Sequence, residues 1–228
     1  MAQPMKSSIC KLVCAVITLA GPLAHAAPFT LWDNGGPSIS TPGGSEMSSY
    51  LQAANFTTSF ATTLSSASFW SLEANLAYAG SISYSIFGNI SGAPDETTVF
   101  TTGSVAPTRT DTGDTVFGLS VFQYDFGLSV TNLAAGTYWL ALHNGALSTG
   151  AGEEEFYWAW SDVNGLDDQE RSLFPPDPTW GPNQAEHAFL IAGERFIGEQ
   201  PISEPGTLLL ATLAAGLGLT SSRRRATA

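Results

Sequence analysis

Residues 133–145 read Leu-Ala-Ala-Gly-Thr-Tyr-Trp-Leu-Ala-Leu-His-Asn-Gly, a pattern typical of a strand in the middle of a β-sheet. Turn signals bound it, with Ala135-Gly136 before the strand and Asn144-Gly145 after it. Between the turns, side chains alternate between two faces, and both sets are mainly apolar: Tyr138, Leu140 and Leu142 against Trp139, Ala141 and His143. This indicates a central strand, or a strand with one face on the core and the other lining a groove.

The chain between residues 27 and 197 repeats this pattern of short alternating runs separated by turn signals. Serine, threonine, glycine, β-branched and aromatic residues dominate it, and only 12% of the whole chain is charged. No segment predicts a helix of appreciable length. The predicted strands are Phe29–Trp32, Asn55–Leu64, Ser68–Ala77, Ser81–Phe87, Thr97–Thr101, Thr115–Tyr124, Gly127–Thr131, Thr137–His143, Glu155–Trp160 and His187–Ala192, with one turn at Asp111-Thr112-Gly113-Asp114.

These strands predict an all-β domain over residues 27–197, built as a two-sheet antiparallel β-sandwich. We expect a jelly-roll-like form, because closing two Greek keys hides most of the sheet edges. The sequence has no repeat at a fixed period, which disfavours a propeller or a solenoid. Residues 198–202 are expected to form a spacer behind this domain.

A second aromatic segment, residues 155–160, reads Glu-Phe-Tyr-Trp-Ala-Trp and places Phe156, Trp158 and Trp160 on one strand face. Core packing is the simpler explanation for such a face. The alternative is a sugar-binding platform, since flat rings suit the apolar faces of pyranose rings. Its candidates are Trp158, Trp160 and Trp180, although Trp180 lies in a proline-rich loop and is favoured as a lid on the sandwich edge.

The body of the chain is strongly acidic. Residues 27–202 contain only three basic residues, Arg109, Arg171 and Arg195, against 19 acidic ones, which gives a formal net charge of −16. Such a surface repels nucleic acid and anionic lipid, so we expect no nucleic-acid partner. It would attract divalent cations, although the solubility of a secreted protein explains the charge equally well.

One loop gathers several oxygen ligands of the kind that calcium prefers. Calcium takes about six to eight oxygen atoms, and a glycine-containing loop rich in Asp and Asn supplies them. The spacing departs from that of an EF-hand, and an acidic solvated loop is the alternative. No other cofactor is expected. The predicted calcium ligands are Asp162, Asn164, Asp167, Asp168 and Glu170.

Sequence signals for catalysis are absent. The body has two histidines, His143 and His187, which are too few for a three-histidine zinc site. It has no His-Glu-x-x-His, Gly-x-Ser-x-Gly or phosphate-loop motif. We therefore expect a protein that is not an enzyme. A secreted glycoside hydrolase stays an alternative, because a sandwich can bring distant carboxylates together, with Glu73, Asp125 and residues 153–155 available.

The N-terminus predicts a secretory signal peptide over residues 1–26. Lys6 and Lys11 form a basic region, an apolar run follows over residues 12–23, and Ala24-His25-Ala26 fits the small-x-small cleavage pattern. An uncleaved signal anchor is the alternative. Both cysteines of the chain lie inside this segment, so the mature body would contain neither a disulfide nor a thiol.

The C-terminus has three parts in order. Ser203-Glu204-Pro205-Gly206 break the preceding structure, residues 207–222 are apolar and uncharged, and Arg223-Arg224-Arg225 follow. The apolar run is shorter than the ~20 residues of a relaxed membrane helix, and the arginines would hold their end in the cytoplasm. This order predicts a temporary membrane anchor over residues 203–228. An ordinary tail anchor is the alternative.

This tail resembles the PEP-CTERM sorting signal, with Ser203 in the place of the usual first proline. The resemblance implies export by the Sec machinery and transient anchoring in the inner membrane by the C-terminal helix. It also implies cleavage near the motif by a membrane enzyme called exosortase, with transfer to the cell surface or the extracellular matrix.

The body is similar to secreted PEP-CTERM proteins with a jelly-roll-like domain, on residues 133–142, 156–162 and 188–194. That resemblance implies a fold and a setting but no activity. The expected function is therefore that of an exported, non-catalytic cell-surface or exopolysaccharide-matrix protein associated with biofilm. The alternatives are a carbohydrate-binding module stabilised by calcium, with extracellular polysaccharide as partner, and a secreted hydrolase.

Overall fold

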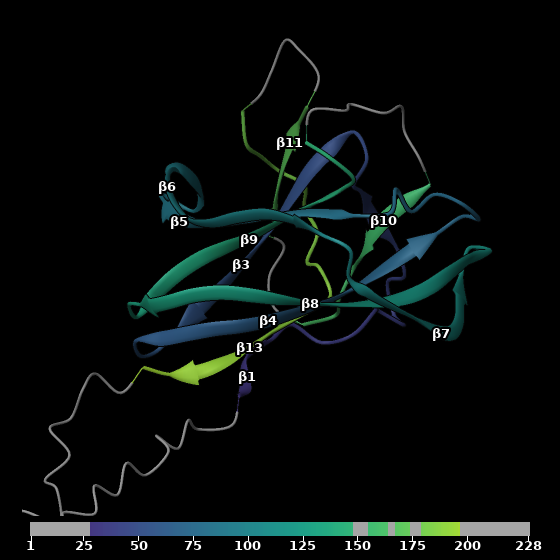
Figure 1. Ribbon diagram of the computed structural model, residues 1–228. Helices are drawn as coiled ribbons and strands as arrows, with labels where there is room; N and C mark the ends of the chain where they lie inside the picture. Colours follow the sequence, from purple (N-terminus) through teal and green to yellow (C-terminus); the bar gives the residue numbers. More distant parts are fainter. Residues whose placement is uncertain (1–27, 148–154, 164–166, 174–178, 197–228) are drawn as a thin grey trace, which may run out of the picture.

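The computed structural model describes residues 28–147, 155–163, 167–173 and 179–196. In these ranges the chain forms thirteen strands and no helix, arranged as two antiparallel sheets (Figure 1). The predicted all-β class and two-sheet antiparallel architecture are confirmed. Within the same ranges no helix is long and apolar enough to cross a membrane. The expected signal peptide, spacer and sorting signal lie outside the described residues.

The seven-stranded sheet is organised around its longest interface, between β4 and β8. On the other side of β4, β13 pairs along the first part of the strand and β10 along the last part. β7, β1 and β2 extend the sheet beyond β8, β13 and β10 respectively. The strands are β1 (Phe29–Asp33), β2 (Gly44–Glu46), β4 (Thr62–Glu73), β7 (Thr108–Val116), β8 (Leu119–Leu133), β10 (Phe156–Ala159) and β13 (Phe189–Arg195).

The six-stranded sheet has the order β12-β11-β3-β9-β5-β6. β9, the strand predicted to be central, pairs with β3 on one side and with β5 on the other, so that prediction is confirmed. The strands are β3 (Tyr50–Thr58), β5 (Ile82–Ile90), β6 (Ala93–Val105), β9 (Gly136–Asn144), β11 (Gln169–Ser172) and β12 (Gly181–Pro182).

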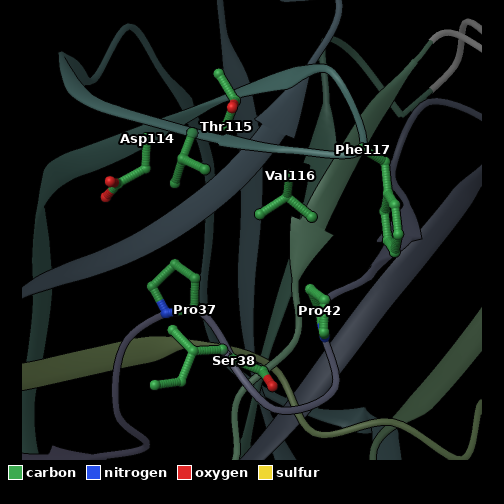
Figure 2. A pocket seen from close by; sticks show the side chains of 9 residues that line it. Pro37, Ser38, Pro42, Asp114, Thr115, Val116 and Phe117 are labelled. Carbon is green, nitrogen blue, oxygen red and sulfur yellow. The ribbon is translucent and has the colours of Figure 1, made fainter.

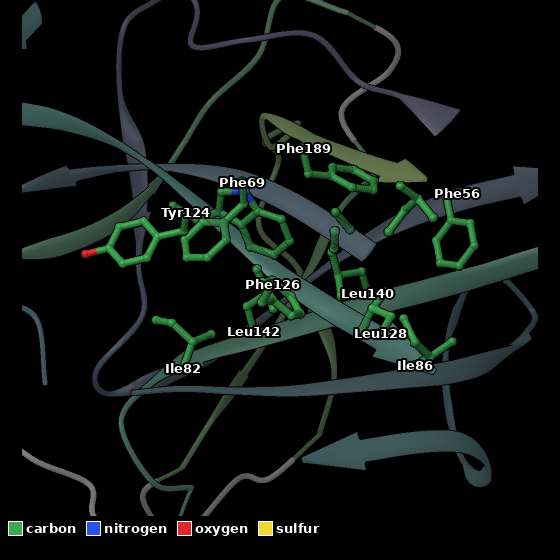
Figure 3. Packing of buried hydrophobic residues seen from close by; sticks show 14 of the residues in the cluster. Phe56, Phe69, Ile82, Ile86, Tyr124, Phe126, Leu128, Leu140, Leu142 and Phe189 are labelled. Atoms are coloured by element: carbon green, nitrogen blue, oxygen red, sulfur yellow. The ribbon is translucent and has the colours of Figure 1, made fainter. Parts of the chain in front are cut away.

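The main core lies between the two sheets. Phe56, Ile86 and Leu140 come from the six-stranded sheet and meet Phe69 and Tyr124 from the other sheet, all of them fully buried (Figure 3). The rings of Phe69 and Tyr124 stack with their centroids 4.9 Å apart. Burying each large apolar side chain contributes roughly 1.5–3 kcal/mol, so this layer makes the sandwich a firm support for its loops.

The outer face of β9 is also covered, as its apolar pattern predicted. Trp139 and Ala141 form a second buried cluster with residues of β3 and β5, and Leu173 and Trp180 pack over it. Trp180 therefore lies on the outer face of the six-stranded sheet. Its Nε1 donates a hydrogen bond of 2.7 Å to Glu96 Oε1, and its ring meets Phe87 edge-on.

Two predicted strands have the wrong boundaries because each was drawn through a turn. Asn55–Leu64 is not one strand: β3 ends at Thr58 and β4 begins at Thr62, with Ser-Phe-Ala between them. The strand predicted over Ser68–Ala77 ends at Glu73 instead, and Leu76 then adopts a positive φ of 69°. No glycine, proline, asparagine or aspartate signals the first of these turns.

The hairpin between β7 and β8 was also predicted wrongly. Gly113, expected in a turn, lies inside β7 with a φ of 81°, where the register shifts between Asp111 and Thr115. The turn is at Phe117-Gly118, with φ values of 53° and 84°. Two positive φ values in a two-residue hairpin loop are the geometry of a type I′ turn, in which a phenylalanine is unusual.

β8 then continues past Gly127, so the separate strand predicted over Gly127–Thr131 is part of β8. Register shifts of the β4–β8 pair absorb the irregularity, between Thr62 and Leu64 and between Leu64 and Ser66 on the β4 side. The short strands β2, β11 and β12 were not predicted, because two to four residues carry no readable alternation.

Candidate functional site

The described surface has a cleft beside the β7–β8 hairpin. It consists of two adjoining hollows of about 450 and 470 Å³, which share Pro42 and Phe117. These volumes fall within the range of about 300–1,000 Å³ that is usual for small-molecule sites. The lining residues are Pro37, Ser38, Ile39, Pro42, Gly43, Gly44, Leu72, Asp114, Thr115, Val116, Phe117, Leu119, Val121, Tyr157 and Trp160.

The β7–β8 hairpin forms one wall of the cleft. Figure 2 shows Val116 and Phe117 pointing from the hairpin towards the loop that carries Pro37 and Pro42. Because Phe117 occupies the first position of the I′ turn, its ring projects from the hairpin and is 80% exposed. Ile39 lines the same hollow and is also exposed, so the rim of the cleft is apolar on both sides.

The floor of the cleft carries two aromatic rings, those of Tyr157 and Trp160, both half-buried. Trp160 Nε1 donates a hydrogen bond of 3.0 Å to Ser45 Oγ, which fixes the plane of the indole. Gly43 lies so close that a Cβ there would collide with the Trp160 ring, and a Cβ on Gly44 would lie 2.7 Å from the Cβ of Tyr157. Gly43 therefore allows the backbone to lie directly on the Trp160 ring, and Gly44 allows it to lie close to the backbone of β10.

Asp162 holds the opposite wall, the loop of residues 38–41. Its carboxylate accepts hydrogen bonds from Ser38 Oγ (2.5 Å), Ser40 Oγ (2.6 Å) and Thr41 Oγ1 (3.2 Å). The hydrogen bonds from Ser38 and Ser40 lower the pKa of Asp162 to about 2. Ile39 sits between these anchored residues and is 95% exposed at the cleft rim. Asp162, predicted as a calcium ligand, thus orders the cleft loop.

The three candidate tryptophans do not share one surface. Trp160 lies in the cleft, whereas Trp180 lies on the six-stranded sheet. Trp158 is fully buried: its ring stacks on His187 at 4.5 Å, and its Nε1 donates to the carbonyl of Ala188. A ring with no exposed face offers nothing to a sugar, so Trp158 is a core residue. Phe117 and Tyr157 were not among the predicted ligand-binding residues.

The remaining predicted calcium ligands do not lie together in one site either. Glu170 Oε2 accepts a hydrogen bond of 3.3 Å from Gln52 Nε2, and Asn164 lies outside the described residues. Asp167 and Asp168 instead meet Glu186, which the sequence reasoning missed because it lies far along the chain. The carboxylate oxygens of Asp167, Asp168 and Glu186 lie within 4.8 Å of one another, a grouping called the carboxylate cluster below.

Glu186 is a nearly buried acid of this cluster with a strongly raised pKa. Its side chain is only 3% exposed, and Asn34 Nδ2 donates a hydrogen bond of 2.7 Å to its Oε1. Burial, together with the neighbouring charge of Asp168, raises the pKa of Glu186 to about 8. Burial likewise raises the pKa of Asp168, against the lowering effect of His187 at 2.5 Å. The cluster therefore favours an added positive charge.

Two of the acids named for a hydrolase, Glu73 and Asp125, have structural partners, whereas Glu153 and Glu154 lie outside the described residues and Glu155 is exposed. Glu73 is buried and accepts hydrogen bonds from Arg109 Nη2 (2.7 Å), Tyr124 Oη (2.6 Å) and Ser71 Oγ. Asp125 accepts hydrogen bonds from Ser68 and Gln123. A carboxylate saturated by donors in the interior serves as an anchor of the fold and is poorly placed to receive a proton from a substrate.

The chain matches no protein-family model and no curated protein.

Proposed function

We propose that the chain is an exported, non-catalytic protein of the cell surface or the extracellular matrix, sorted and cleaved by an exosortase. The observation that carries the proposal is the order of the C-terminal tail, with Ser203–Gly206, an uncharged apolar run and Arg223–Arg225. The predicted signal peptide at the other end agrees with it. A cysteine-free, acidic β-sandwich suits a body that has to stay soluble outside the cell.

We further propose that the sandwich is a jelly roll. The strand order supports this: β1, β13, β4 and β8 are neighbours in one sheet, and β3, β9, β5 and β6 in the other. Strands that follow one another in sequence, such as β3, β4 and β5, alternate between the sheets. Two Greek keys folded onto each other produce such crossing connections.

Mass spectrometry of the secreted material tests the sorting proposal. A tag in an exposed turn of the body, such as the one at Gly92, allows the protein to be purified separately from membranes and from the extracellular matrix. The proposal predicts matrix protein that begins at Ala27 and ends near Ser203–Gly206. Protein that retains Arg223–Arg225 and occurs only in membranes would contradict it and indicate a tail-anchored periplasmic protein.

Carbohydrate binding at the cleft is the second candidate function. The observation that favours it is the pair of half-buried rings, Tyr157 and Trp160, on the floor beneath the exposed Phe117. Stacking of such rings on sugar faces needs no charge on the ligand. Because the body carries a formal charge of −16 and Asp114 lines the cleft, a neutral saccharide fits better than an acidic one.

Titration with a neutral polysaccharide, followed by tryptophan fluorescence, tests this second function. We expect a saturable change from Trp160, and a weaker apparent affinity in Phe117→Ser, which retains every tryptophan. Trp180→Phe serves as the control, because its ring lies on the other sheet. A signal that is absent, or that is equal in wild type and Phe117→Ser, would exclude sugar binding at this cleft.

A further inference from the structure

The carboxylate cluster of Asp167, Asp168 and Glu186 lies where the segments before β11 and β13 meet, and it shares no residue with the lining of the cleft. Asp167 and Asp168 directly precede β11, and Glu186 precedes β13. Asp168 is fully buried and Glu186 nearly so, while Asp167 is exposed. The cluster therefore has a buried side that is fixed by the fold and an open side that faces water.

No arginine balances this concentration of charge. The three arginines of the body lie elsewhere: Arg109 pairs with Glu73, Arg171 with Glu96, and Arg195 lies over the ring of Phe60. The body contains no lysine. His187 Nδ1 lies 2.5 Å from Asp168 Oδ2, so the imidazole pairs with Asp168 and not with the other two carboxylates. Three carboxylates this close repel one another unless a proton or a cation joins them.

One carboxylate oxygen of Glu186 has no hydrogen-bond donor. Glu186 Oε2 is buried and has no hydrogen-bond partner, although most buried polar atoms in proteins have one. Asn34 Nδ2 donates both to Glu186 Oε1 (2.7 Å) and to the carbonyl of His187 (2.8 Å), so the carboxylate is held with Oε2 left over. One carboxylate oxygen of Glu186 lies within 4.8 Å of an oxygen of Asp167 and of Asp168, and Oε2 is the Glu186 oxygen that no donor occupies.

Asp168 is held just as firmly. The backbone N–H of His187 donates to Asp168 Oδ2 (2.8 Å), and the backbone N–H of Asn55 lies 3.4 Å from Oδ1. Two acids of the cluster therefore have fixed orientations before any ligand arrives. A preformed arrangement of this kind reduces the entropy that a bound ion has to overcome.

We propose that Asp167, Asp168 and Glu186 bind one divalent cation of the calcium type. The ligand atoms are all oxygen, which calcium prefers, and the exposed side at Asp167 leaves room for water to complete the coordination. Magnesium requires a stricter octahedral geometry and gives up its water reluctantly, so it should bind more weakly. Glu186 is thus a proposed ligand of the ion, in place of Asp162 and Glu170, which the sequence predicted as ligands.

Thermal unfolding of the purified chain in EDTA, in CaCl₂ and in MgCl₂ at equal ionic strength tests the proposal. With free Ca²⁺ about one hundred times its Kd, Tm should rise by about 5–10 °C. Glu186→Gln should abolish this rise while still folding, because the amide resembles the protonated carboxyl and keeps an oxygen for Asn34. Asp167→Asn should also reduce it. Glu155→Gln, an exposed acid outside the cluster, is the matched control and should respond like wild type.

The alternatives give distinct results. If Ca²⁺ leaves the Tm of the wild type unchanged, the cluster holds only a proton and the proposal is wrong. If Ca²⁺ raises the Tm of Glu186→Gln as much as that of wild type, the ion binds elsewhere on the acidic surface and the proposal is equally wrong. A response restricted to chains with an intact Glu186, stronger for Ca²⁺ than for Mg²⁺, is the expected result.

Discussion

Replacing Arg109 with alanine should destabilise the sandwich far more than replacing Arg171, although the two ion pairs have nearly equal lengths. Arg109 Nη2 lies 2.7 Å from Glu73 Oε2, and Arg171 Nη1 lies 2.6 Å from Glu96 Oε1. The acids differ in burial: the side chain of Glu73 is 1% exposed, and that of Glu96 is 42% exposed. The prediction is that burial of the acid, and not the length of the pair, determines the loss.

The magnitude follows from what each substitution leaves behind. Arg109→Ala leaves the Glu73 charge in the interior with only the hydroxyls of Tyr124 and Ser71 as donors. Removing one partner of a buried pair costs about 3–5 kcal/mol, and an exposed pair contributes about 0–1 kcal/mol. Because the side chain of Arg109 is itself 36% exposed, we expect a loss of about 3 kcal/mol, at the lower end of that range.

Urea unfolding followed by tryptophan fluorescence measures both losses, and for Arg109→Ala the Tm should fall by roughly 6–12 °C. Adding Glu73→Gln to Arg109→Ala should recover much of the stability, because it removes the uncompensated charge. Equal losses for the two arginines would refute this reasoning. So would a double variant that is no more stable than Arg109→Ala.

Three further predictions concern the cleft and the carboxylate cluster. The pKa of Glu186 is raised from 4.5 to about 8, so between these pH values the folded chain holds a proton that the unfolded chain releases. In EDTA, the free energy of unfolding should therefore fall by roughly 2–4 kcal/mol as pH rises from about 4.5 to 8. Thermal melts of Glu186→Gln should lack this pH dependence. The pKa of Asp162 is lowered from 3.8 to about 2, so the stabilisation that its carboxylate gives is present above pH 3.8 and is lost as pH falls towards 2. Asp162→Ala should therefore speed proteolysis of the 38–41 loop at neutral pH. The wild type should approach that proteolysis rate only in acid. Gly43→Ala should cost about 1–3 kcal/mol and shift tryptophan emission by displacing Trp160, whereas Gly36→Ala, with nothing within 4 Å of the added Cβ, should leave the emission unchanged.

The centre of the sandwich was predictable because local pattern and tertiary packing agree there. β9 alternates between two apolar sets and has turn residues at both ends, and the structure places each set against its own cluster. A strand buried on both faces has no alternative position in a two-sheet fold. Its neighbour β5 was predicted as Ser81–Phe87, close to its observed bounds. For β3 the prediction covered only Asn55–Thr58, because the predicted strand began five residues late and ran through a turn that lacks a turn residue.

The candidate sites could not be predicted in the same way, because they depend on turn geometry and on long-range contacts. Phe117 reaches the cleft only because the hairpin turns at Phe117-Gly118, whereas the sequence favoured the glycine four residues earlier, which forms a bulge. Glu186 joins Asp168 only after β11 and β13 have taken their places in different sheets. Neither contact has a signal within a short window of sequence.

The segment between β1 and β2 connects the two candidate sites physically. At its start, Asn34 donates to Glu186 of the carboxylate cluster, and further along, Ser38 and Ser40 donate to Asp162 beside the cleft. The backbone continues this connection, because Ser161 N donates to the carbonyl of Glu186, and Ser38 N to that of Trp160. An ion bound to Glu186 would therefore further stabilise the segment that forms one wall of the cleft. Since coupling between two binding sites is reciprocal, a ligand that orders this wall would in turn raise the affinity of the carboxylate cluster for the ion.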